Sequence, residues 1–216
     1  MTTLALIQTL AKMAKEHRKR VWSLAELARL CGESHASVGM SLVRARKKGI
    51  VARVGSLWLN MMDAPTLEEV AFALVSPSYI SFESALYRCG ILSQAPRGAM
   101  TVATLGRPRL VATPLGDIRF IRLKRSLFFG YDAQRVAYPE KAWLDLLYLR
   151  RRKGDTIAET MYPESLNRKR MKGFAAHFPP LNHVNYGATR RNPNYSASYS
   201  AGGDCGKMRP SRKGNR

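Results

Sequence analysis

The sequence has few residues of the kinds that hold metal ions or build disulfide frameworks. Its three cysteines, Cys31, Cys89 and Cys205, lie far apart, no C-x-x-C pair occurs, and the four histidines do not cluster with them. Zinc sites and disulfide frameworks need such residues at short, regular spacings. We therefore expect no metal site, and we expect the cysteines to remain reduced thiols.

Long apolar runs are also missing. No stretch of about 18 uncharged apolar residues occurs, which is the length that a membrane-spanning helix needs. At the N-terminus the apolar residues precede the charged ones, which is the reverse of the order in a secretory signal. Because 45% of the residues are apolar, a core can still form. We expect a folded cytoplasmic protein without a membrane partner.

Recognisable catalytic signatures are absent from the sequence. It contains no G-x-x-x-x-G-K-[ST], no H-E-x-x-H and no G-x-S-x-G. The stretch "RGAMTVATLG" has glycines, but they lack the spacing of a dinucleotide-binding loop. The histidines occupy positions typical of solvated or structural residues. We therefore expect neither enzyme activity nor a cofactor.

Acidic residues are scarce, since 15 Asp and Glu stand against 36 Lys and Arg and the net charge is +21. Residues 1–60 have 11 Lys and Arg against 3 Asp and Glu, residues 61–149 have 10 against 8, and residues 150–216 have 15 against 4. The net charges of these segments are +8, +2 and +11. So large a cationic excess favours a polyanionic partner, either nucleic acid or an anionic membrane surface. The nearly neutral middle is a poor candidate for binding phosphates.

Residues 1–62 have the pattern of three helices followed by a β-hairpin. Apolar residues recur at helical spacing over 4–14, and "SLAE" (23–26) matches a capping box at the start of a short second helix. A third helix is predicted over "SHASVGMSLVRARKKG" (34–49). The stretch "IVARVGSLWLN" (50–60) then alternates apolar residues around a Gly-Ser turn, which predicts a hairpin. This order of elements is that of a winged helix-turn-helix.

The third of these helices has the composition of a DNA-recognition helix. Such a helix needs a low-profile N-terminal half to enter the major groove and cations near the flanking phosphates. Small polar side chains are expected on its exposed surface near the start, cations at its far end, and one cation in the hairpin. The residues predicted to contact DNA are Ser34, His35, Ser37, Ser41, Arg44, Arg46, Lys47, Lys48 and Arg53. The competing interpretation is a small helical domain that makes no contact with DNA.

The rest of the chain divides into a folded domain, 63–180, and a tail, 181–216. The domain combines helix patterns ("TLEEVAFALV", "SYISFESALYRCG", "PESLNRKRMKGFAAHFPP") with β signals ("MTVATL", "RLVAT", "DIRFIRL"), so the predicted fold class is α+β. Thr66 and Glu69 match a capping box at the start of the first of these helices, and Ser81 is the expected cap of the second. The turn "TPLGD" predicts that the last two strands form a hairpin. The tail loses all periodicity and is rich in Asn, Gly, Ser, Tyr and Arg, so we expect a low-complexity basic segment without packed structure.

One further helix, "YPEKAWLDLLYLRRR" (138–152), is apolar around most of its circumference. Pro139 suits the first helical position, and Glu140 suits the positive end of the helix dipole. Such a helix lies in a core, where the carboxylate of Asp145 needs a partner because an unpaired buried charge is costly. The expected partner is Lys141, one turn earlier, or an arginine of "DIRFIRLKR". The sequence favours an internal ion pair over a catalytic or recognition role.

The stretch "PEKAWLDLLYL" (139–149) resembles the PEKALLDLLYL signature of the AbiEi family of antitoxins, from type IV toxin–antitoxin and abortive phage-infection systems. "SYISFESALYRCGIL" resembles the family's helix of the form Y-I-S-x-x-S-A-L-x-x-x-G-I, and "VATPLGDIRFIRLK" resembles its T-P-x-G hairpin. "FFGY" precedes the PEK motif as it does in the family, which also has an N-terminal winged helix-turn-helix. The resemblance covers roughly residues 5–180, and the tail after "HFPP" matches nothing in the family.

The resemblance implies a bacterial antitoxin with two roles. Residues 1–62 would bind inverted repeats of double-stranded DNA in its own promoter and repress the operon. Residues 63–180 would neutralise a nucleotidyltransferase-type toxin, with or without direct contact, and would carry the family motif Pro139, Glu140, Lys141 and Asp145. Two other interpretations stay open from the residues alone. One is a stand-alone transcriptional regulator whose C-terminal domain senses a ligand or dimerises, and the other is an enzyme acting on nucleic acid, which would need a carboxylate cluster that the sequence lacks.

Overall fold

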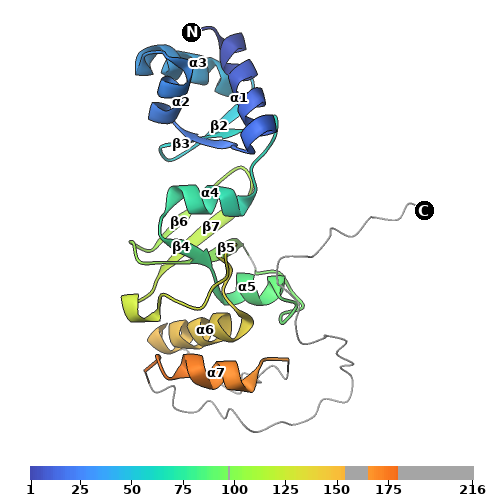
Figure 1. The fold of residues 1–216 in the computed structure, drawn as a ribbon, viewed down its shortest axis with the longest axis vertical. Coiled ribbons are helices and arrows are strands. Elements are labelled where there is room, and N and C mark those ends of the chain that lie inside the picture. Colours follow the sequence, from blue (N-terminus) through green and yellow to red (C-terminus); the bar gives the residue numbers. More distant parts are fainter. Residues whose placement is uncertain (97, 154–164, 180–216) are drawn as a thin grey trace, which may run out of the picture. The chain divides into compact units, whose positions relative to one another are not determined.

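The computed structural model describes residues 1–96, 98–153 and 165–179 (Figure 1). It confirms the predicted α+β class. The chain folds into two compact units, of which the first comprises Met1–Ser78 and Gly98–Arg122 and the second Tyr79–Arg97 and Leu123–Arg216. None of the helices in the described ranges combines the length and the apolar character that crossing a bilayer requires. The tail predicted over 181–216 lies outside the described residues.

The first unit begins with three helices and three short strands. Their bounds are α1 (Thr3–His17), β1 (Val21–Ser23), α2 (Leu24–Cys31), α3 (His35–Lys47), β2 (Val51–Val54) and β3 (Leu57–Asn60). The strands pair antiparallel in the order β1-β3-β2, so the predicted hairpin forms and β1 extends its sheet. Apolar residues at helical spacing meet in one core, which includes Leu6, Leu10, Trp22, Leu27, Val38, Leu42 and Trp58.

Local caps explain where these helices begin. The predicted capping box of α2 is present, since Ser23 Oγ accepts from Glu26 N at 3.2 Å and Glu26 Oε2 accepts from Ser23 N at 2.8 Å. Lys19 Nζ donates to Glu26 Oε1 at 2.7 Å, and this bond is the main cause that lowers the pKa of Glu26 to about 2. Ser34 Oγ accepts from Ser37 N at 3.2 Å and so caps α3. Both starts are therefore fixed within four residues of sequence.

The same unit continues through one helix and three strands. Their bounds are α4 (Leu67–Leu74), β5 (Ala99–Thr104), β6 (Arg109–Val111) and β7 (Asp117–Arg122). β6 and β7 form the predicted antiparallel hairpin, whereas β5 pairs parallel with β7. A second core cluster joins Val54 and Leu59 of the β2–β3 hairpin to Val70, Ala71, Val102, Ile118 and Phe120. The boundary predicted at residue 62 therefore lies inside this unit.

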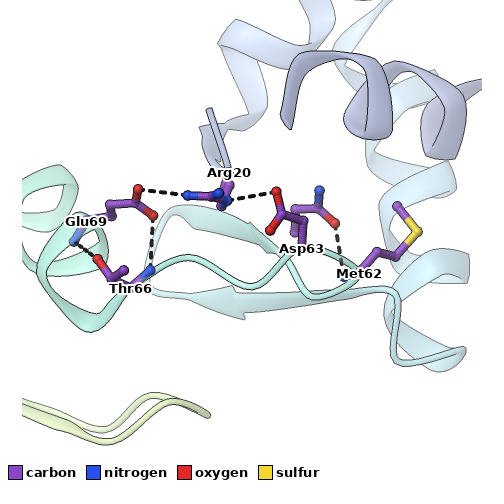
Figure 2. A network of polar contacts seen from close by, with 6 residues as sticks. Arg20, Met62, Asp63, Thr66 and Glu69 are labelled. Carbon is purple, nitrogen blue, oxygen red and sulfur yellow. Dashed lines mark hydrogen bonds and ion pairs between the residues drawn. The ribbon is translucent and has the colours of Figure 1, made fainter. Parts of the chain in front are cut away.

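A polar network also crosses that predicted boundary (Figure 2). Arg20 Nε donates to Asp63 Oδ2 at 2.9 Å, and Arg20 Nη1 donates to Glu69 Oε1 at 3.1 Å. Glu69 also closes the predicted capping box of α4, because its Oε2 accepts from Thr66 N at 3.0 Å while Thr66 Oγ1 accepts from Glu69 N at 3.2 Å. One arginine before β1 thus ties the segment after β3 and the start of α4 together.

The second unit is mainly helical. Strand β4 (Ser78–Ile80) runs across the division of the chain, and the unit then contains α5 (Phe82–Arg88), the 3-10 turn η1 (Arg125–Leu127), α6 (Pro139–Lys153) and α7 (Arg168–Ala175). Ser81 occupies the N-cap position of α5, as predicted, but its side chain makes no cap bond there. Its hydroxyl donates to Asp145 instead. Cys31 is a free thiol, as the sequence predicts.

Candidate functional site

Helix α3 has one face in the core and the opposite face in solvent. The buried residues recur at the spacing i, i+3, i+4 and i+7 and are Val38, Ser41, Leu42 and Ala45. This spacing places them on a single side of the helix. Every residue between Met40 and Lys48 that lies outside this set is exposed.

The cations at the end of α3 are exposed and have no acidic partner among the residues that the structure describes. Arg44, Arg46, Lys47 and Lys48 are all exposed, and none forms an ion pair with any residue in the described ranges. Their charges therefore remain available to an anionic ligand. They occupy the last turn of α3 and its C-cap, and cations in such a position can contact phosphates.

The cation of the hairpin is held more firmly than those of α3. Arg53 is exposed, its Nε donates to the carbonyl of Gly55 at 3.1 Å, and its guanidinium lies 5.5 Å from the centre of the Trp58 ring. The remaining guanidinium N–H groups can still donate to an anion. The hairpin thus presents a preoriented charge.

The predicted contacts near the start of α3 are only partly confirmed as surface residues. Ser34 and His35 are exposed, and Ser37 is half-buried. Ser41 is fully buried and its hydroxyl donates to the carbonyl of Met1 at 2.8 Å, so the prediction that Ser41 lies on the exposed surface is wrong. The reason is its position one residue before Leu42 and three after Val38, which puts it on the core side of the helix.

Three surface residues of α3 were absent from the predicted set. Ala36, Met40 and Val43 are exposed, with exposed fractions of 56% for Met40 and 46% for Val43. They lie four and three residues apart, which places them on the side of α3 opposite the buried residues. The helical period predicts that they lie on the surface. They were not predicted as contacts because they are neither charged nor polar.

In the second unit, the family-like motif of α6 builds a buried polar cluster. Lys141 and Asp145 have exposed fractions of 0%, and the lysine ammonium donates to Asp145 Oδ1 and, at 3.1 Å, to the hydroxyl of Tyr79. Asp145 Oδ2 accepts from Ser81 Oγ at 2.7 Å and from the hydroxyl of Tyr79 at 3.1 Å. The predicted ion pair between Lys141 and Asp145 is therefore present. The hydroxyls of Tyr79 and Ser81 also form hydrogen bonds with this pair, and the sequence did not predict these two partners.

Aromatic rings enclose this cluster. The Lys141 ammonium lies 5.0 Å from the ring centre of Phe129 and 5.1 Å from that of Phe178, distances at which cation–π attraction operates. Burial lowers the pKa of Lys141 and raises the pKa of Asp145, and the attraction between the two charges opposes both shifts. Burial, with the Asp145 charge beside it, also raises the pKa of Tyr79, so the Tyr79 hydroxyl remains a donor.

The other acid of the motif joins α6 to α7. Glu140 is 4% exposed, its Oε1 accepts from Asn167 N at 2.9 Å, and its Oε2 lies 3.6 Å from Arg170 Nη1. These contacts hold Glu140 in the unit's interior, whereas Pro139, at the first position of α6, is half-buried. Burial keeps Glu140, Lys141 and Asp145 from direct contact with a macromolecular partner. In the described ranges, no group of three His, Cys, Asp or Glu side chains could hold a metal ion.

Comparisons with known proteins found a distant structural similarity. No protein-family model matches the chain, and no curated protein matches it either. Among solved structures, the chain is similar to the RV2827C protein from Mycobacterium tuberculosis, with 14% sequence identity and a TM-score of 0.48. The similarity covers 84% of this chain and 74% of that one.

Proposed function

We propose that the protein is a winged helix-turn-helix DNA-binding protein and that it serves as the antitoxin and autorepressor of a type IV toxin–antitoxin operon. Its first six elements follow the order helix, strand, helix, helix and hairpin, with α3 as the recognition helix and β2–β3 as the wing. The observation that carries the DNA-binding part is the group of exposed cations Arg44, Arg46, Lys47 and Lys48, none of which is ion-paired within the described part of the chain.

The placement of these cations suits DNA better than a small anion. A recognition helix directs its N-terminal half toward base edges and leaves its flanks beside the phosphates. Here the first turns of α3 include the small residues Ala36, Ser37 and Gly39, and the cations follow at the far end. Arg53 on the hairpin adds a cation in a second element. Two separated cationic elements match the phosphate backbone of a duplex.

The antitoxin part rests on the resemblance of "PEKAWLDLLYL" and its companion motifs to the AbiEi family. The buried Lys141–Asp145 cluster is compatible with a motif whose residues maintain the fold rather than touch the toxin. A toxin would then contact the surface of the second unit or be neutralised without direct contact. The alternative is a stand-alone regulator whose second unit senses a ligand or dimerises.

DNA binding is expected to be sequence-specific and strongly dependent on salt. Binding of the purified chain to its own upstream region should weaken as salt rises, because phosphate contacts release counterions. Arg44→Ala and Lys47→Ala should each lower the affinity for all duplexes and reduce the slope of log K against log salt by about 0.9. Fluorescence anisotropy over a salt series measures both quantities.

A matched control removes a cation from another helix of the same unit. Lys12→Ala takes an exposed lysine from α1 and should leave the slope unchanged. Equal affinity of the unaltered protein for its upstream region and for random duplex at physiological salt would contradict the proposal, as would an equal loss of slope in the Lys12 variant.

Protection from a toxin should be separable from DNA binding. A neighbouring reading frame for a nucleotidyltransferase should arrest growth when expressed, and co-expression of this protein should restore growth. The double variant Arg44→Ala/Lys47→Ala should still protect while failing to repress a promoter reporter, because its changes lie on α3. Repression without any protection by the unaltered protein would instead support the stand-alone regulator.

A further inference from the structure

We infer that α3 recognises the C5-methyl groups of thymines in the major groove, through Met40 and Val43, and therefore selects A·T-containing half-sites. This inference rests on the proposed DNA-binding function and names what the same helix would read. It starts from the face of α3 that points directly away from the core.

The outermost stripe of α3 is apolar over its first three turns. Ala36, Met40, Val43 and Lys47 recur at i, i+4, i+7 and i+11, which places them in one line along the helix. This line lies opposite the buried set Val38, Ser41, Leu42 and Ala45. Met40 and Val43 leave about half of their side-chain surface in solvent, with exposed fractions of 56% and 46%. A helix inserted in a groove presents this line to the base edges.

The same turns lack the long side chains that read guanine and adenine through two hydrogen bonds. Guanine is recognised by bidentate Arg or Lys, and adenine by Asn or Gln. Between His35 and Val43 there is none of these residue types, and the first cation of α3 is Arg44. Thymine alone presents a methyl group in the major groove, and apolar side chains contact it. Apolar contact is therefore the readout that this stripe can supply.

The positive charge around the apolar stripe favours a polyanion as the binding partner of this surface. Arg44 and Arg46 flank it on either side of the helix, Lys47 continues it, and none of them is ion-paired within the described part of the chain. A protein partner for an apolar stripe would meet these uncompensated cations, whereas DNA phosphates neutralise them. An apolar line between cations thus matches the floor and the walls of a major groove.

Deoxyuridine provides a direct test, because it differs from thymidine only by the missing methyl group. In the upstream duplex bound by the protein, each thymine inside the footprint is replaced by deoxyuridine, one at a time. Replacement of a contacted thymine should lower the affinity about fourfold, the factor expected for one buried methyl-sized group. The salt slope should not change, since phosphate contacts are untouched. Deoxyuridine outside the footprint is the control.

Protein variants assign the methyl contact to the stripe. Met40→Ala and Val43→Ala should remove the difference between thymine and deoxyuridine at their own contacted positions, and Met40→Leu should retain it. Arg44→Ala should weaken both duplexes alike and leave their ratio intact. Circular dichroism of each variant checks that α3 remains folded.

The outcomes separate this inference from the proposed function. If no duplex binds specifically, both are overturned. If the upstream duplex binds specifically but thymine and deoxyuridine give equal affinities at every position, the methyl readout is overturned and DNA binding stands. If Met40→Ala dissociates an oligomer in analytical ultracentrifugation and leaves the thymine ratio unchanged, the stripe is an interface between copies of this chain and the inference is also overturned.

Discussion

Asp145→Ala is expected to lower the free energy of unfolding by about 3–5 kcal/mol, the usual cost of breaking a fully buried ion pair from one side. The substitution leaves the Lys141 ammonium without its carboxylate inside a shell that includes Phe129 and Phe178. It also removes the acceptor of the Tyr79 and Ser81 hydroxyls. The free energy of unfolding of a domain is about 5–15 kcal/mol in total. Thermal melting and urea titration of the full chain should therefore show a large fall in the midpoint of unfolding.

Two further variants show whether the charge or the shape of Asp145 matters. Asp145→Asn keeps the shape and should be milder than alanine, although it weakens the pairing. The double variant Lys141→Met/Asp145→Leu removes both charges and should cost less than Asp145→Ala, because no charge is stranded. If Asp145 instead contacts a toxin or ligand, the Asp145→Ala protein would melt at the normal temperature but would not protect cells from the toxin. That result would contradict the structural role.

Gly130→Ala is expected to destabilise the same unit by about 2–5 kcal/mol. The residue has a φ of +74°, and a Cβ added there would lie 3.0 Å from Lys141 Cγ and 3.3 Å from Lys141 Cβ. The left-handed conformation costs a non-glycine residue about 1–2 kcal/mol, and overpacking against a fixed side chain adds about 1–3 kcal/mol. The Lys141 stem cannot move aside readily, because its ammonium is held by Asp145 and Tyr79.

Gly90→Ala is the matched control for this prediction. Gly90 belongs to the same unit and has a similar φ of +71°, but a Cβ added there would meet nothing within 4 Å. It should therefore show only the conformational cost of about 1–2 kcal/mol. Urea titration of both variants separates the conformational cost from the cost of overpacking. Equal losses of unfolding free energy in the two variants would mean that Gly130 does not pack tightly on Lys141.

Sequence reasoning succeeded where the decisive contacts are local. The capping boxes at Ser23 and Thr66 join residues three apart, and the Lys141–Asp145 pair joins residues four apart on one helix. Such spacings bring side chains together once a helix forms, whatever the rest of the chain does. The hairpin of β6 and β7 was predictable for the same reason, since one turn connects its strands.

Contacts distant in sequence could not be predicted in this way. Ser81 lies 64 residues before Asp145, and its choice of that carboxylate over the cap of α5 depends on how α6 packs. The assignment of Val54 and Leu59 to a core shared with Ile118 likewise needs the parallel pairing of β5 and β7. Ser41 is different, because its spacing to Val38 and Leu42 was visible and only its polar character suggested exposure.

The interleaved division of the chain has a consequence for how the protein is made. Ribosomal synthesis releases residues 1–78 before β5 and β7, so the hairpin residues Val54 and Leu59 emerge well ahead of their partners Val102, Ile118 and Phe120. The first unit cannot close its second core cluster until about residue 120 has left the ribosome, and by then residues 79–97 of the other unit have already emerged. Neither unit can be exchanged between genes as one uninterrupted segment, so recombination at a single junction would divide at least one of them.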